Sequence, residues 1–108
     1  MSTQSIHRGD IIKNRGKISP KRISVLKSQA AVIKPLVRLG KNGLSHNQIV
    51  EINRMLSKRK LVKVKLLPGF PEKNIEETAL KIASKTSSVI VTVIGNNIVL
   101  YREKTGKK

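Results

Sequence analysis

The chain has 108 residues, and its 23 lysines and arginines against 6 aspartates and glutamates give a formal net charge of +17. This length predicts one domain, and the lack of cysteine excludes disulfides and thiolate zinc sites. No apolar run is long enough to span a membrane, and the N-terminus has no apolar signal core, so we expect a cytoplasmic protein. The cationic excess favours a polyanionic partner, RNA or DNA. An anionic membrane surface would require aromatic anchors, and the only aromatic residues are Phe70 and Tyr101, so we expect no membrane partner.

The chain begins with a polar, basic segment, residues 1–18, which lacks a sustained hydrophobic period and is predicted to be a flexible arm. This arm either contacts nucleic acid or only adds solubility. Ser19 followed by Pro20 is typical of a helix start, and Pro35 is expected to end this first helix. Its predicted helical face consists of Ile23, Leu26, Ala30 and Ile33.

A short predicted strand, residues 36–39, ends at Gly40-Lys41-Asn42-Gly43, and Ser45 with Gln48 then has the capping-box spacing that begins a second helix. Such a turn often only reverses the chain. Glycine, however, lets the backbone approach a phosphate, and a helix N-terminus offers free N–H groups and a positive dipole end. Ten of the 23 basic residues precede Asn42, which favours phosphate binding. The predicted buried stripe of the second helix is Ile49, Ile52, Met55 and Leu56.

The residue pattern in the second half of the chain predicts a strand, a helix and a hairpin. Residues 61–67 alternate between apolar side chains and the lysines Lys63 and Lys65, which indicates a strand with one solvated face. A loop at 68–71 precedes a third helix, which Ser87-Ser88 ends. Two β-branched runs flank Gly95-Asn96-Asn97 and predict a hairpin. The stripe of the third helix is Ile75, Ala79, Ile82 and Ala83, and the hairpin strands are 89–94 and 98–101.

The predicted order is therefore helix, strand, helix, strand, helix, strand, strand. Strands separated by helices favour an α/β or α+β fold, a four-stranded mixed sheet with three helices packed on it. We expect this domain to cover residues 19–103 and to be followed by a short basic tail, residues 104–108.

No catalytic constellation is evident in the sequence. The two histidines are His7, in the predicted arm, and His46, which we interpret as a solvated residue in the first turn of a helix. Glu76 and Glu77 are adjacent and therefore diverge on a helix. We expect no catalytic residue, metal, cofactor or small-molecule substrate. Because exposed aromatic rings are scarce, binding should depend on phosphate and sugar contacts, and it should be sensitive to salt.

The segment Leu39-Gly40-Lys41-Asn42-Gly43-Leu44-Ser45, followed by residues 49–52, resembles the signature of the CRM-domain family (chloroplast RNA splicing and ribosome maturation), which includes small bacterial YhbY proteins. Three further segments agree in order, so the likeness spans about residues 20–102. Four matched segments are more specific than a Gly-x-x-Gly turn alone. The further segments are 61–65, 75–83, and 93–95 with 99–102.

The resemblance implies a fold similar to the C-terminal domain of bacterial translation initiation factor three. It also implies RNA binding in which the GxxG loop, here Gly40, Lys41, Asn42 and Gly43, is a principal contact. Single-domain bacterial relatives associate with precursors of the large ribosomal subunit, whereas plant relatives with several copies assist intron splicing. The single copy in this chain favours the ribosomal role, although its basic arm departs from the compact bacterial form.

We therefore expect a monomeric, non-enzymatic protein that binds ribosomal RNA of large-subunit precursors during ribosome assembly. The GxxG loop and the capped helix start at Ser45 would hold backbone phosphates. Arg38, Arg54 and Lys58 would flank the groove. The alternatives are a DNA-binding, chromatin-coating protein, an RNA-splicing cofactor and an RNA-processing enzyme.

Overall fold

The computed structural model describes residues 18–103, so the predicted tail and all of the predicted arm except Ile18 lie outside the described residues. The described part confirms the predicted order of elements and the predicted fold class. Its elements are α2 (Pro20–Ala30), β1 (Val37–Leu39), α3 (His46–Arg59), β2 (Leu61–Leu66), α4 (Ile75–Thr86), β3 (Val89–Ile94) and β4 (Asn97–Tyr101).

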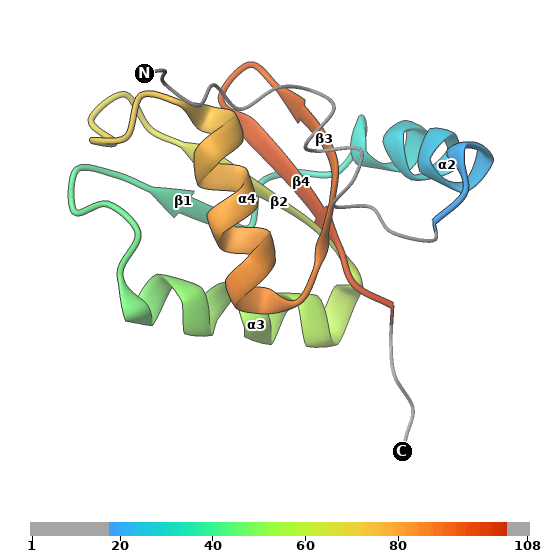
Figure 1. Cartoon of the computed structure of the whole chain (residues 1–108), viewed down its shortest axis with the longest axis horizontal. Helices are drawn as coiled ribbons and strands as arrows, with labels where there is room; N and C mark the ends of the chain where they lie inside the picture. The colour runs from blue at the N-terminus through green and yellow to red at the C-terminus, as the bar shows by residue number, and fades with distance from the viewer. Residues whose placement is uncertain (1–17, 104–108) are drawn as a thin grey trace, which may run out of the picture.

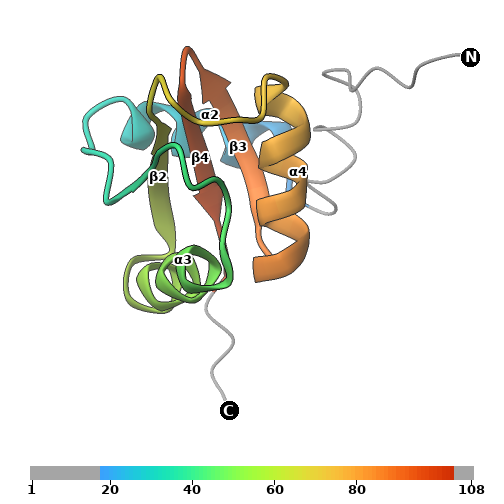
Figure 2. The same ribbon diagram turned by 90° about the vertical axis from the view of Figure 1, so that its left-hand side faces the viewer.

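The four strands form one mixed sheet in the order β1-β2-β4-β3. Strand β1 runs parallel to β2, and β4 runs antiparallel to both of its neighbours. The sheet stands between α2 on one side and α3 with α4 on the other (Figures 1 and 2). Because β1 and β2 are parallel, their C-terminal ends lie at the same end of the sheet, and the loops that follow them lie there too.

Both faces of β4 are buried, which explains its continuous apolar run. Ile98 and Leu100 belong to the larger core beneath α3 and α4, whereas Val99 and Tyr101 pack against α2. Successive side chains of a strand point to opposite faces, so one strand contributes to two cores. Ile18, the last residue of the predicted arm, packs at the margin of the smaller core.

Each described helix begins with a side-chain N-cap. The Oγ atoms of Ser19 and Ser45 accept hydrogen bonds from the backbone N–H groups of Arg22 and Gln48, at 3.1 and 3.3 Å. Asn74, which the sequence analysis did not single out, caps α4 in the same way. These caps satisfy N–H groups that have no partner within the helix and so fix where each helix starts.

The predicted end of the first helix was wrong. Helix α2 ends at Ala30, so Ile33 is not part of its helical face. Val32 and Ile33 instead donate to the carbonyl groups of Gln29 and Ala30, at 3.3 and 3.4 Å. These i to i+3 bonds are a tighter turn that ends the α-helix before Pro35, whose ring disfavours helical geometry in the residue before it.

Candidate nucleic-acid interface

The predicted GxxG segment forms a closed turn, here called the glycine turn (Gly40–Gly43), between β1 and α3. The N–H group of Gly43 donates to the carbonyl oxygen of Gly40 at 3.0 Å. Lys41 and Asn42 are exposed at its tip, whereas Gly43 is buried with a φ of 73°. This φ lies in the left-handed region that glycine adopts readily and other residues rarely do.

A second loop, residues 67–71, braces the glycine turn from the side. Its own turn is closed by a 2.9 Å bond from the Phe70 N–H to the Leu67 carbonyl, and the Leu67 N–H donates to Leu39 at 2.8 Å. Gly69 lies against Lys41, and the Pro71 ring lies against Gly43. Figure 1 shows the two loops next to each other at the end of the sheet that carries β1. These contacts and hydrogen bonds restrict the conformations that the turn can adopt.

The two glycines of the turn should respond differently to alanine. Gly43→Ala is expected to lower the free energy of unfolding by about 1 to 2 kcal/mol, because a Cβ at positive φ is strained. Gly40→Ala should change it by less than about 0.5 kcal/mol, since its Cβ would lie 3.6 Å from Leu67 Cδ1 in ordinary contact. Urea denaturation of the two variants measures both values. Equal losses would contradict a special backbone requirement at Gly43.

Helix α3 begins at His46, three residues after the end of the glycine turn. Its first turn contains no acidic residue, so no side-chain carboxylate there offsets the positive end of the helix dipole. His46 is exposed at the first helical position, as expected. The Ser45 hydroxyl is engaged in the cap, so its role in this structure is to start the helix. The helix end and the turn therefore present N–H groups to the same region.

The structure brings only some of the predicted flanking cations to this region. Arg38 is exposed on β1, two residues before the turn, and lies in register with Lys65 of β2. Arg54 donates to both carboxylate oxygens of Glu51, at 2.8 and 3.0 Å, which offsets its charge. At 1.5 Å of rise per residue, Arg54 and Lys58 lie about 14 and 20 Å along α3 from Ser45. Arg38 therefore adjoins the turn, whereas the other two are remote.

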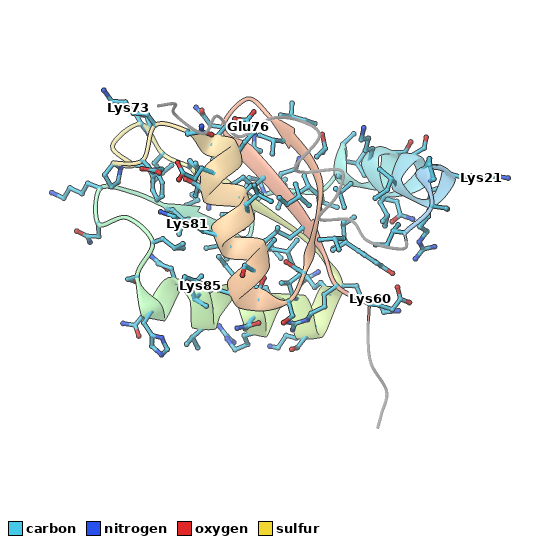
Figure 3. The ribbon with its side chains drawn as sticks, viewed as in Figure 1. Lys21, Lys60, Lys73, Glu76, Lys81 and Lys85 are labelled. Carbon is cyan, nitrogen blue, oxygen red and sulfur yellow. The ribbon has the colours of Figure 1, made fainter. Side chains whose placement is uncertain are left out.

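Two lysines that were not predicted as binding residues lie beside the turn. Lys81 and Lys85 lie one turn apart on α4, on the side that faces the loop between β1 and α3 (Figure 3). With the glycine turn they border a groove, here called the basic groove. Its lining consists of Gly43, Leu44, Phe70, Pro71, Glu72, Thr78, Lys81 and Lys85.

Of the two aromatic side chains, only Phe70 adjoins the turn. Tyr101 is buried in the smaller core, where its hydroxyl accepts a hydrogen bond from Arg22 at 3.0 Å and donates to Glu103. The hydrogen bond to Tyr101 and the charge of Glu103 raise the pKa of Arg22, which stays protonated. Tyr101 therefore cannot serve as a stacking surface for a base, in line with the predicted lack of an aromatic array.

The described residues contain neither a metal cluster nor a membrane span. Across 18–103, no three histidine or acidic side chains gather in a way that could hold a metal ion. Over the same range, none of the helices combines the length and the apolar character needed to cross a bilayer. The residues around the glycine turn offer backbone amides, exposed cations and a small apolar surface.

The sequence of the folded part matches a known domain. Residues 18–102 match the CRS1/YhbY (CRM) domain, which takes in the braced turn and every described helix and strand. The chain belongs to the CRM-domain family. Its CRM domain therefore covers nearly all of the described residues, as the resemblance of the glycine turn and its neighbouring segments implied.

Relatives of this CRM domain come from distant organisms. It is 33% identical over 91 residues to the Probable RNA-binding protein YqeI of Bacillus subtilis, covering 84% of this chain and 94% of the relative. It is 32% identical over 99 residues to the Probable RNA-binding protein MJ0652 of Methanocaldococcus jannaschii, covering 89% and 72% of the two chains. The solution structure of the hypothetical protein SAV1595 from Staphylococcus aureus aligns with a TM-score of 0.71 and 35% identity over 84% of this chain and 94% of the other. The Bacillus and Methanocaldococcus relatives are named as probable RNA-binding proteins, in agreement with the expected non-enzymatic character.

Proposed function

We propose that this CRM domain binds RNA and holds its sugar-phosphate backbone on the glycine turn. The observation that carries the proposal is a turn braced by a neighbouring loop, with an exposed tip, next to a helix N-terminus without acidic residues, in a chain of net charge +17. Backbone N–H groups at such a place bind phosphate oxygens, and Lys41 adds positive charge. The names of the Bacillus and Methanocaldococcus relatives support RNA as the polyanion.

Ribosomal RNA of a large-subunit precursor is the specific partner that we propose, bound by a monomer in the cytoplasm. The match covers 94% of the Bacillus subtilis relative, which supports this choice over a role as a splicing cofactor. A plant relative, the mitochondrial CRS2-associated factor 1 of rice, is 31% identical over 78 residues, but the match covers only 18% of that longer protein. A DNA-coating role remains the second candidate, because phosphate contacts alone do not distinguish the two nucleic acids.

Salt dependence and competition test this function. The logarithm of the association constant for a structured ribosomal RNA fragment should fall linearly with the logarithm of the salt concentration. The slope should be about −2 to −4, since a small site contacts only a few phosphates. Duplex DNA of equal charge should compete weakly at matched salt. A slope near zero would contradict phosphate recognition, and preferential binding of the duplex DNA would favour the second candidate.

A further inference from the structure

The basic groove beside the glycine turn has two chemically different sides. It encloses about 390 Å³ and begins at Gly43, the last residue of the turn. Leu44, Phe70 and Pro71 supply apolar surface, whereas the α4 side is polar. Leu44 and Phe70 are partly buried against the larger core, so this side of the groove is fixed by packing. An apolar surface next to a phosphate-binding turn has the chemistry of a site for a nucleotide base.

The α4 side of the groove carries positive charge. Lys81 and Lys85 are both exposed, and a spacing of four residues places them on the same side of the helix. Lys81 Nζ lies 4.0 Å from Glu72 Oε2, with 56% of the lysine side chain exposed, so this ion pair is weak. The two lysines extend the cationic surface of the turn along α4.

We propose that the basic groove receives the base of one unpaired nucleotide of the RNA. This inference rests on the proposed function of the turn. The turn would hold the phosphate on one side of that nucleotide, the Phe70 ring would contact the base, and Lys81 with Lys85 would hold the next phosphate. Bases in a continuous helix are paired and stacked, and they cannot enter such a groove. The ligand is therefore a single-stranded segment of RNA, as in a loop, a bulge or an end.

Two RNA oligomers of equal charge test whether a base is bound. A ten-nucleotide oligouridylate is compared with a ribose-phosphate oligomer of the same length that lacks bases. The oligouridylate should bind at least about fivefold more tightly, because the contact of one base with an aromatic ring increases the affinity by at least that factor. Phe70→Leu keeps an apolar side chain in the core and should bring the ratio of the two affinities close to one. Equal affinities for the wild-type chain, or a ratio that Phe70→Leu leaves unchanged, would overturn the proposal.

A lysine pair tests the path of the strand without affecting the core. Lys81→Gln/Lys85→Gln should weaken the binding of both oligomers by about fivefold at low salt. The matched control is Lys21→Gln/Lys27→Gln on α2, which removes the same charge at the end of the molecule where Figure 3 labels Lys21. The control variant should lower the affinity for each oligomer by less than about twofold. Equal losses of affinity in the two double variants would contradict the proposal that the RNA strand follows the basic groove.

The same titrations separate failure of this inference from failure of the proposed function. If the base-free oligomer binds as tightly as oligouridylate, the turn still holds a phosphate backbone and only the base site is lost. If neither oligomer binds, both proposals fall. If oligouridylate alone binds, and Phe70→Leu abolishes its advantage, the groove is a base site.

Discussion

Replacing Lys41 and Asn42 together with aspartate is expected to lower the affinity for RNA by more than about tenfold. Both side chains are exposed at the tip of the glycine turn, so the change removes one positive charge and places two carboxylates where we propose that a phosphate binds. The fold should be unaffected, because neither side chain belongs to either core. Fluorescence anisotropy with a labelled ribosomal RNA fragment measures the affinity, and an amide NMR spectrum monitors the fold.

The matched control is Lys21→Asp/Ser24→Asp in the first two turns of α2. It exchanges one lysine and one neutral residue for two aspartates, so the net charge changes by the same amount. Both positions are exposed, and an aspartate at position 21 lies in the first turn, where it interacts favourably with the helix dipole. Remote charges are screened at physiological salt, so this variant should lose only about twofold in affinity. A loss equal to that of the turn variant would mean that net charge, and not the turn, determines binding.

Local signals were sufficient to predict the fold. The N-caps Ser19 and Ser45, the alternation in β2 and the Gly95-Asn96 turn each constrain only a few neighbouring residues, yet together they determined the order of elements. The end of α2 was placed too far along, because the apolar period continues to Ile33 whereas the tighter turn ends the helix sooner. Periodicity indicates which residues share a face, but it does not fix where the hydrogen-bond pattern changes.

The candidate site was predictable only at its centre. The glycine turn was identified from its residues, but the brace formed by residues 67–71 depends on the parallel pairing of β1 and β2, which brings two distant loops together. The Glu51 partner of Arg54 could have been recognised from its i, i+3 spacing, and it argues against a free cation. Lys81 and Lys85 gave no distinct signal, because lysines on the exposed side of an amphipathic helix are ordinary. Their placement beside Gly43 depends on how α4 packs.

The packing of Arg102 shows how a basic residue can serve the fold in a chain rich in cations. Its guanidinium donates four hydrogen bonds that join the end of β4 to two helices. Nη1 lies 2.7 Å from Asn53 Oδ1 and 2.7 Å from the Thr86 carbonyl oxygen. Nη2 lies 3.1 Å from the Asn53 carbonyl oxygen and 2.9 Å from Ser57 Oγ. The planar fork of an arginine matches acceptors in this arrangement, and a lysine cannot reproduce it.

Arg102→Ala is therefore expected to lower the free energy of unfolding by about 3 kcal/mol, since it removes charge-assisted hydrogen bonds and leaves the half-buried Asn53 amide oxygen without a partner. Arg102→Lys should lower the free energy of unfolding by about 2 kcal/mol, because lysine keeps the positive charge but lacks the planar guanidinium that donates these hydrogen bonds. Arg22→Ala is the control. Among the described residues, its exposed guanidinium donates a hydrogen bond only to the Tyr101 hydroxyl, so its removal should lower the free energy of unfolding by less than about 1 kcal/mol. Urea denaturation monitored by circular dichroism gives all three values.

The RNA affinity of the Arg102 variants distinguishes a structural role from a binding role. At temperatures where they remain folded, both variants should bind the ribosomal RNA fragment within about twofold of the wild-type chain, because the guanidinium is remote from the glycine turn and its loss acts only as a distant charge. A folded Arg102→Ala protein that binds much more weakly would place RNA at the far end of α3. In that case Lys58, in the last turn of the same helix, would become a contact again, and the turn would be only one part of a longer interface.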